Sequence, residues 1–511
     1  MSAVKWIALT GWNEYSTRFV DPPTWTWNQV PGVARYRVRM ARPHEPARSF
    51  DTPEPRFSMA DSWAEWPAGP IDLVVEGYDA GGREACMPSW PKRFYKVPGF
   101  DGVRQEPLDW QGAVRKNIAN LLAPAGDADE PYERGWPRSA WSSFEDTATG
   151  QRFRLAYPAQ NHPAFVMAFV RFAEAFADDP LAQEALRQAR QYGDWMLANR
   201  FPEDWACGLF PYSTSENGQS SGGKEGQNIT LFRAAFAGEA MVALHEAFGD
   251  AEYLDYARHL AEALIRLQRT DGSWPYRVNP RDGSVSQDYT SDTVGPARLF
   301  AKLEQFKAGD AYTKAREKAI GWMLQNPVKT RLWQGQFEDF GENTPYENLE
   351  QVDTNELIRY LVVFRDQVPG AVDIAEDLNR YIEDQFVVWQ REESPVPVEC
   401  PTPTVLEQYL CYWPMEINTG YWILSLIALH EATGKQEYLD KAVAAANAIL
   451  HGQYENGAFS TWGRDWRFGR PLRTDDWPAG GAVAAEALLY LDRYYQAVQR
   501  GETPGRALLK L

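Results

Sequence analysis

Hydrophobic residues recur along most of this chain with the period of a helix. From about residue 107 to 500, apolar positions return every three or four residues in twelve segments. One of them, 251–268, places Tyr253, Tyr256, Leu260, Leu264 and Leu267 on a single stripe, whereas the preceding segment 229–248 is apolar or small nearly all round. A striped helix covers a core from one side, and an all-apolar helix is buried on most sides. The pattern therefore predicts alternating outer and inner helices.

The connections between the twelve segments alternate in length. The segments are 108–122, 162–178, 181–199, 229–248, 251–268, 292–307, 310–325, 353–367, 370–390, 416–433, 436–451 and 479–498. Turns of a few residues, such as ADDP at 177–180, follow the even-numbered segments, and about 20 to 40 residues follow the odd-numbered ones. The short turns return about every 60 to 70 residues, and 243–274 aligns with 428–459 as an internal repeat. Six such hairpins predict a mainly α fold, an (α/α)6 toroid with every long loop on one face.

The first hundred residues follow a period of two instead. In VPGVARYRVRM, Tyr36, Val38 and Met40 alternate with arginines, as in a half-buried strand, and Pro and Gly signals close further short strands. The stretch resembles a fibronectin type III or immunoglobulin-like sandwich through WTWNQVPGVARYRV and the Tyr before DAGG. The expected domains are a small all-β sandwich over 1–100, the toroid over 107–500 and a C-terminal tail over 501–511. The sandwich is interpreted as a spacer or packing partner.

Composition and charge exclude several classes of protein. A net charge of −18 argues against a nucleic-acid partner, because phosphate binding needs a basic surface. No apolar run reaches the roughly 18 to 20 residues of a membrane span, and the start of the chain carries no export signal. The protein is therefore expected in the cytoplasm, or as a secreted or periplasmic protein if a signal was removed. The 21 Trp and 24 Tyr are typical of glycan enzymes, in which sugars stack on aromatic faces, and equally of large cores.

Polar residues gather where the long loops lead into the predicted inner helices. A helix start offers free N–H groups and the positive end of a dipole, although Asp, Asn and Ser there are also common caps worth about 1 kcal/mol. The candidates for glycan binding are Trp141, Asn161, Asn228, Trp274, Tyr276, Trp333, Glu338, Asp339, Trp413, Asn418, Arg464, Trp466, Asp475 and Asp476. The candidates for catalysis are His162, Arg277, Tyr289, Asp292 and Asp353. Of the six histidines, only His162 is expected on the loop face.

Two motifs connect the expected toroid with known enzymes. A ring with aromatic, carboxylate-rich loops resembles the toroid carbohydrate-active enzymes. The loop DGSWPYR (271–277) resembles the Gly-Gly-Trp-Pro loop of toroid pectate lyases, although Ser273 replaces one of the glycines. The stretch SDTVGPARLFAKLEQFKAGDAYTKA (291–315) resembles an inner helix of unsaturated glucuronyl hydrolases, which an Asp-Thr pair opens. Both resemblances imply cleavage of glycosidic bonds in a polysaccharide or oligosaccharide.

β-Elimination on a uronate-containing glycan is the reaction that the sequence slightly favours. It needs groups that neutralise a carboxylate, a base for a C–H proton and an acid for the leaving oxygen. Asn161, Asn228 and Arg277 are candidates for the first task. His162 is the candidate base and Tyr289 the candidate acid. Histidine and tyrosine suit these tasks because a protein site can bring their pKa values towards neutrality.

Hydrolysis by paired carboxylates is the alternative of nearly equal weight. It needs a carboxylic acid of raised pKa and a second carboxylate nearby. Asp292 with Asp353 is one candidate pair, and Glu338 with Asp475 is another. A sugar epimerase and a non-catalytic glycan-binding scaffold also stay open, whereas the Asp-x-Asp-Asp motif of toroid terpene cyclases is absent.

A glycan is the only partner that the sequence predicts. No cofactor is predicted. The sequence leaves the binding of a calcium ion open, because its aspartate ligands would look like ordinary loop residues. The oligomeric state is not predicted.

Overall fold

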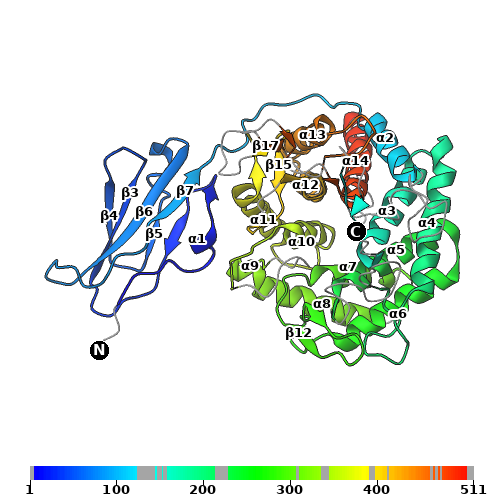
Figure 1. The fold of residues 1–511 in the computed structure, drawn as a ribbon, viewed down its shortest axis with the longest axis horizontal. Coiled ribbons are helices and arrows are strands. Elements are labelled where there is room, and N and C mark those ends of the chain that lie inside the picture. Colours follow the sequence, from blue (N-terminus) through cyan, green and yellow to red (C-terminus); the bar gives the residue numbers. More distant parts are fainter. Residues whose placement is uncertain are drawn as a thin grey trace.

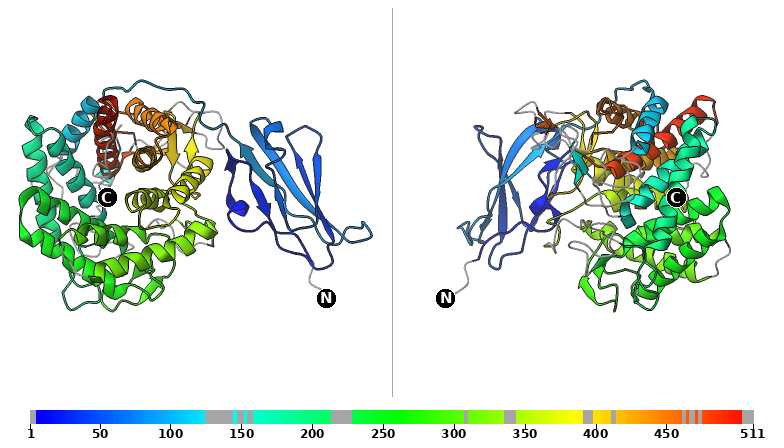
Figure 2. Two further views of the ribbon diagram at one scale, coloured as in Figure 1. Left: turned by 180° about the vertical axis from the view of Figure 1, so that it is seen from behind. Right: turned by 45° about the vertical axis from the view of Figure 1, so that its right-hand side comes forward.

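The computed structural model contains a ring of helices and a β part beside it (Figure 1). It describes residues 5–123, 144–146, 152–153, 158–212, 228–306, 310–334, 344–390, 398–410, 414–460, 464–465, 470–471 and 475–502. Of 144–146, 152–153, 158, 398–399, 464–465, 470–471 and 475–476 only the backbone is described. Figure 2 shows the β part at one flank of the ring from two further directions.

Six inner helices form a closed ring. They are α3 (Pro158–Ala175), α5 (Phe232–Phe248), α7 (Val294–Glu304), α10 (Val352–Val363), α12 (Glu416–Thr433) and α14 (Pro478–Gln499). Each packs against the next along the chain, and α14 packs against α3, so the last inner helix meets the first. This closure is the defining property of the toroid.

Six outer helices surround that ring, one against each inner helix. They are α4 (Pro180–Ala198), α6 (Ala251–Leu267), α8 (Asp310–Gln325), α11 (Ala371–Gln385), α13 (Gln436–His451) and α2 (Trp110–Leu122), which pack on α3, α5, α7, α10, α12 and α14 respectively. The fold is therefore an (α/α)6 toroid, which confirms the sequence prediction. Two short helices, α1 (Trp12–Tyr15) and α9 (Pro327–Thr330), were not predicted.

The repeat seen in the sequence corresponds to two equivalent helix ends. Helices α5 and α12 each end at a glycine in the left-handed region, Gly249 with φ 76° and Gly434 with φ 68°. The N–H of each glycine donates to a histidine carbonyl oxygen four residues earlier, His245 or His430, at 2.8 Å. Glycine adopts this conformation without the strain that a Cβ atom would bring. The sharp stop lets the outer helix begin within two residues.

The long loops bond to one another in short strands. Strand β10 (Ile229–Thr230), which leads into α5, pairs with β11 (Arg277–Val278), which leads towards α7. Strand β8 (Phe144–Asp146) pairs with β19 (Asp475–Asp476), and β14 (Val398–Glu399) pairs with β17 (Arg464–Asp465). The other loop strands are β9 (Arg152–Phe153), β12 (Val285–Gln287), β13 (Val387–Val388), β15 (Thr404–Leu406), β16 (Pro414–Met415) and β18 (Arg470–Pro471). Loops that precede different inner helices thus share one end of the ring.

The β part is a two-sheet sandwich. One sheet has the order β1 (Arg18–Phe19), β7 (Lys92–Lys96), β6 (Gly69–Tyr78), β3 (Arg35–Ala41) and β4 (Arg48–Thr52), and β2 (Thr24–Thr26) pairs with β5 (Arg56–Ser58) in the other. A single 3-10 turn, Trp63–Glu65, precedes β6. Tyr36, Val38 and Met40 of β3 are buried, as their alternation predicts.

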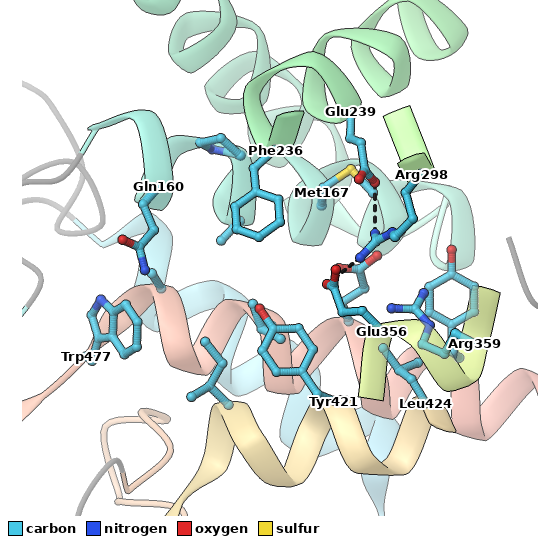
Figure 3. A pocket seen from close by; sticks show the side chains of 17 residues that line it. Gln160, Met167, Phe236, Glu239, Arg298, Glu356, Arg359, Tyr421, Leu424 and Trp477 are labelled. Carbon is cyan, nitrogen blue, oxygen red and sulfur yellow. Dashed lines mark hydrogen bonds and ion pairs between the residues drawn. The ribbon is translucent and has the colours of Figure 1, made fainter. Parts of the chain in front are cut away.

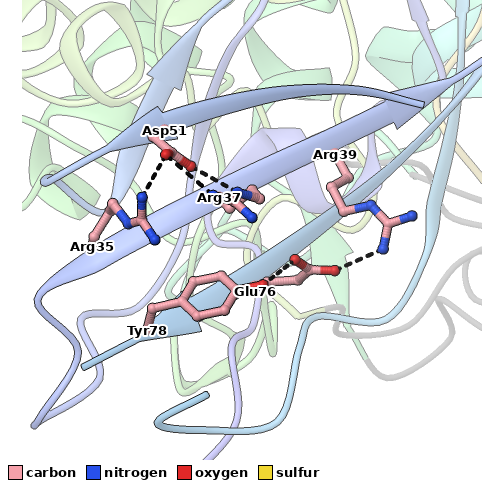
Figure 4. Close-up of polar contacts among 6 residues, drawn as sticks. All are labelled: Arg35, Arg37, Arg39, Asp51, Glu76 and Tyr78. Carbon is pink, nitrogen blue, oxygen red and sulfur yellow. Dashed lines mark hydrogen bonds and ion pairs between the residues drawn. The ribbon is translucent and has the colours of Figure 1, made fainter. Parts of the chain in front are cut away.

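The opposite face of β3 carries arginines that pair with acids of the neighbouring strands. Arg35 donates to Asp51 at 2.7 Å and Arg39 to Glu76 at 2.9 Å, and Tyr78 donates to the same glutamate (Figure 4). These side chains are partly exposed, so the pairs define a polar outer face and contribute little stability.

Each part has its own large hydrophobic cluster, and one side chain packs against both. The ring has one large hydrophobic cluster and the sandwich has its own, built around Phe19, Trp25 and Phe94. Trp12 packs against both clusters. Among the described residues, no helix combines the length and the apolar surface needed to cross a bilayer.

Candidate active site

A cavity opens where the inner helices begin. Its mouth is lined by Gln160, Phe232, Phe236, Asp292, Glu350, Val352, Asp353, Glu407, Met415, Ile417, Asn418, Tyr421 and Trp477. These residues come from the first turns of the inner helices and from the loops that precede them. Three predicted site residues, Asp292, Asp353 and Asn418, therefore line one cavity although they belong to three different hairpins.

Three carboxyl groups lie together at this mouth. Asp292, Glu350 and Asp353 are all buried. The hydroxyl oxygen of Ser291 lies 2.7 Å from Oδ2 of Asp353 and 3.3 Å from Oε1 of Glu350. The backbone N–H of Asp353 donates to Oε2 of Glu350 at 3.3 Å, and the two carboxyl groups are hydrogen-bonded to each other. Carboxyl groups that are hydrogen-bonded in this way can share one proton between them.

Burial is the largest cause that raises the pKa of all three acids. Burial is the largest cause for Asp353 and raises its pKa to about 7, against the opposing hydrogen bond from Ser291. Burial, followed by the charge of Asp353, raises the pKa of Asp292 and of Glu350 well above the ordinary carboxyl range. Like charges in a dry site cannot all ionise. At neutral pH the cluster therefore holds a carboxylic acid beside a carboxylate, which is the pairing needed for acid–base chemistry.

An adjoining cavity, which shares Gln160, Phe236 and Tyr421 with the first, lies between charged residues of the inner helices (Figure 3). Arg298 of α7 donates to Glu239 of α5 at 2.9 Å and also pairs with Glu356 of α10. Lys302 lies 3.2 Å from the same Glu239. Burial lowers the pKa of Arg298, but the two glutamates raise it overall, so the guanidinium stays charged. The cation is already matched by protein carboxylates.

Acidic side chains outnumber basic ones around the described part of the cavity. The acids are Glu239, Asp292, Glu350, Asp353, Glu356, Glu407 and Glu486, and the bases are Arg298 and Arg359. Aromatic rings of Phe236, Tyr421 and Trp477 complete the wall (Figure 3). Even with several acids protonated, this lining does not favour a negatively charged ligand.

The structure does not bring together the base and the acid expected for elimination. His162 packs between rings of the outer helix α4, 4.6 Å from Tyr192 and 4.9 Å from Trp195 between ring centroids. Burial lowers the pKa of His162 to about 3. The hydroxyl of Tyr289 donates to the carbonyl oxygen of Leu332 at 2.8 Å. Neither residue belongs to the described cavity lining.

The other five histidines also lie away from the cavity. His245 bonds to the backbone oxygen of Asp250 and His430 to the hydroxyl of Tyr494, both near short turns. His259 and His451 lie on outer helices, and His44 is in the sandwich. All six histidines of the chain are among the described residues, and none lines the cavity. An imidazole base is thus not available there.

Three aromatic residues predicted to bind a glycan are buried in this structure. The exposed fractions are 2% for Trp274, 1% for Tyr276 and 0% for Trp333. Trp274 donates its indole N–H to the carbonyl oxygen of Leu264 at 2.8 Å. Tyr276 stacks at 6.3 Å behind Phe232, which itself lines the mouth. Protein atoms thus cover these three rings, and their role in glycan binding stays a prediction.

The remaining predicted polar residues have other positions. The guanidinium of Arg277 lies 4.9 Å from the Tyr276 ring and donates to Gln287. Asn161 is buried and Asn228 is half-buried. These three residues are not part of the described cavity lining, so the set expected to neutralise a uronate is not assembled there.

Eight candidates cannot be placed through their side chains. Trp141, Glu338, Asp339, Trp413 and Trp466 lie outside the described residues, and of Arg464, Asp475 and Asp476 only the backbone is described. The backbone registers Asp475 against Asp146 and Asp476 against Glu145. Two acidic pairs from opposite ends of the toroid sequence therefore meet in one ladder.

Sequence reasoning missed several residues of the cavity. Glu350 stands only three positions before Asp353, and Glu356 stands one helical turn after it. Tyr421 follows Asn418 at the same one-turn spacing. Extending each predicted helix start inward by a turn would have found these lining residues, because positions three and four apart share a helix face.

The sequence matches no protein-family model and no curated protein. Its fold is similar to that of solved structures at low identity. A family 76 glycoside hydrolase from a bovine Bacteroides thetaiotaomicron strain aligns with 96% of this chain and 99% of its own at 10% identity and a TM-score of 0.51. Cellobiose 2-epimerase from Bacillus thermoamylovorans B4167 aligns with 75% of this chain and 98% of its own at 11% identity and a TM-score of 0.54.

A third similar structure is an unsaturated glucuronyl hydrolase specific for heparin. It aligns with 77% of this chain and 98% of its own, at 12% identity and a TM-score of 0.50. At these identities the likeness defines the class of fold, the (α/α)6 toroid, and no particular activity.

Proposed function

We propose that this protein is a glycoside hydrolase. The observation that carries the proposal is the cluster of Asp292, Glu350 and Asp353, in which burial raises all three pKa values and the charge of Asp353 further raises those of the other two. Hydrolysis of a glycosidic bond needs a carboxylic acid that protonates the leaving oxygen and a carboxylate that acts on the other side. A cluster that retains a proton near pH 7 supplies both forms together. The toroid glycoside hydrolase among the similar structures supports the same class.

Asp353 is the proposed proton donor and acceptor. Its pKa of about 7 leaves it divided between both forms at neutral pH, where a general acid or base is most efficient. The hydrogen bond from Ser291 holds the carboxyl group in place. Asp292 is the proposed partner that takes the complementary form, whereas Glu350, which is hydrogen-bonded to Asp353, is too close to act across a scissile bond and is proposed to set the pKa of Asp353.

A neutral glycan is the proposed substrate, which revises the expectation of a uronate. The acidic lining would repel a uronic acid, and Arg298 is already paired with two glutamates. Elimination is disfavoured for the same reason and because no histidine lines the described cavity. Phe236, Tyr421 and Trp477 offer the aromatic surface on which sugar rings pack.

The test is a product assay on a panel of neutral and uronate-containing oligosaccharides. Reducing ends and the absorbance of unsaturated uronates are followed for the wild type, Asp353→Asn and the control Asp282→Asn. Asp282 bonds to Ser284 in an exposed loop, so its variant controls for loss of an aspartate as such. We expect new reducing ends from the wild type and the control, and a loss of at least about a hundredfold in Asp353→Asn.

Three results would contradict the proposal. An unsaturated product would indicate elimination, and isomerised sugar without new reducing ends would indicate an epimerase. Saturable binding without any product would indicate a glycan-binding scaffold.

A further inference from the structure

Two loops that carry acids into the cavity are bonded to each other. The segments 344–350 and 404–410 bring Glu350 and Glu407 to the mouth. The side-chain amide of Asn348 donates to Gln408 at 2.7 Å and accepts the backbone N–H of Leu410 at 3.0 Å. Tyr409 N–H donates to the carbonyl oxygen of Leu349 at 3.0 Å, and Glu350 pairs with Gln408 in a β-bridge. The two loops therefore move as one unit.

The sandwich contacts this unit at two points. The hydroxyl of Tyr15, at the end of α1, is hydrogen-bonded to Thr344 at the start of the first loop. The hydroxyl of Ser16 donates to Oε1 of Gln385 on α11. The same oxygen accepts the hydroxyl of Tyr409 in the second loop at 2.7 Å. Consecutive residues of the sandwich thus reach both loops, one directly and one through Gln385.

These contacts lie in a firmly attached interface. Asp384, next to Gln385, accepts the backbone N–H groups of Val20 at 2.6 Å and Asp21 at 2.9 Å. Ser16 is fully buried and Gln385 is too. The contact residues are therefore held from both sides, and the sandwich cannot shift without breaking buried hydrogen bonds, each worth about 1 kcal/mol or more.

We propose that the N-terminal sandwich is a positioning element for the active site, acting through Tyr15 and Ser16 on the loops of Glu350 and Glu407. The inference rests on the proposed hydrolase function for its catalytic consequence. The pKa of Asp353 depends on the place of Glu350, because the two groups share a hydrogen bond. Fixing the loop fixes the acid cluster, and displacement of a reacting group by about 1 Å lowers a rate by up to about a hundredfold.

The test compares the double variant Tyr15→Phe, Ser16→Ala with the control Tyr78→Phe. Both remove hydroxyl groups from the sandwich, but the Tyr78 hydroxyl donates to Glu76 on the outer face (Figure 4). Tyr409→Phe breaks the link from the ring side and serves if the double variant folds poorly. Hydrogen exchange of 344–350 and 404–410 reports loop order without any substrate.

In the two link variants we expect exchange in both loops to rise about tenfold and kcat to fall on the order of tenfold with KM changed less. The pH dependence of kcat should also shift, which loss of stability alone would not cause. The control should match the wild type. Unchanged loop exchange and an unchanged pH profile in the link variants would overturn the inference. Hydrogen exchange that rises in the link variants, together with a wild type that cleaves no glycan, would instead overturn the proposed function. The loop-positioning role would then still stand.

Discussion

The raised pKa of Asp353 lowers the stability of the folded protein at neutral pH. Its folded pKa is about 7, whereas a carboxyl group in an unfolded chain titrates near 3.9. Below pH 4 both states are protonated and nothing is lost. As the pH rises from 4 to 7, the unfolded chain ionises first, so the free energy of unfolding falls and stays lowered above pH 7. Groups placed for catalysis often lower the free energy of unfolding in this way.

Asp353→Asn should therefore stabilise the protein at pH 8 and not at pH 4. The neutral amide removes the ionisation, and we expect a gain on the order of 1 to 4 kcal/mol at pH 8 with little change at pH 4. Denaturant midpoints at the two pH values measure it. Asp282→Asn should show the opposite sign, because hydrogen bonds from Ser284 lower the pKa of that exposed acid. An equal effect of Asp353→Asn at both pH values would contradict the raised pKa.

For single residues, the sequence predicted which ones stand at helix starts better than the direction in which their side chains point. Asp292, Asp353 and Asn418 stand at helix starts and line the cavity. His162 also stands near the start of an inner helix, yet its ring meets α4 instead of the lumen. Neighbouring residues of a helix point about 100° apart, so one position decides between lumen and outer layer. That choice depends on how helices pack, which a single segment does not encode.

The loop that follows α6 depends on one glycine. Gly272 has φ 103°, and a Cβ atom there would lie 2.2 Å from the carbonyl oxygen of Lys318 on α8. Gly272→Ala should lower the free energy of unfolding by about 2 to 4 kcal/mol through backbone strain and this clash. The matched control is Gly321→Ala on α8, where a Cβ atom meets nothing within 4 Å. It should be neutral or stabilise by up to about 1 kcal/mol. Similar denaturation midpoints for both variants would contradict the strain and the clash expected at position 272.

The inner helices are tied by charges within the ring. Arg298→Met would leave Glu239 and Glu356 buried without their shared partner, and we expect a loss of about 3 to 5 kcal/mol in unfolding free energy. Arg500→Met, which breaks the exposed pair with Glu502, should change stability by no more than about 0.5 kcal/mol. Chemical denaturation measures both. Equal losses would mean that burial does not set the value of these pairs.

Helix periodicity predicted all twelve ring helices, and its errors are at their ends. The predicted segment 229–248 begins later, at Phe232, because Ile229 and Thr230 pair as a strand with β11. The predicted segment 370–390 ends earlier, at Gln385, because Val387 and Val388 pair with β15. Apolar residues suit a helix end and a strand equally. The neighbouring loop, distant in sequence, decides between them.

The whole molecule should unfold as one unit, because the sandwich and the ring share Trp12 and the bonds of Asp384. Asp384→Ala removes the acceptor of two backbone N–H groups and should separate the thermal unfolding into two transitions in calorimetry. Asp384→Asn keeps an oxygen acceptor and should retain a single transition. Two transitions in the wild type would show that the interface is too weak to couple the parts.

The particular contacts between the two parts were not foreseeable from the sequence. Alternation predicted the strands and helical spacing predicted the ring, but the contacts of Ser16 with Gln385 join residues far apart in the chain. Such a polar pair looks like any two surface residues in the sequence. The sequence interpretation, a spacer or packing partner, named no contact residues, and only the folded arrangement supplies them.

The closure of the ring by its last helix has a consequence for synthesis. The outer helix α2 is the first of the ring to leave the ribosome, and its main inner partner α14 is the last. Until α14 (Pro478–Gln499) is synthesised, Trp110, Val114, Ile118 and Leu121, which are buried in the finished protein, lack the main helix that packs on α2. A chain released before that point keeps part of this apolar strip exposed, and such a chain is expected to bind chaperones or to aggregate.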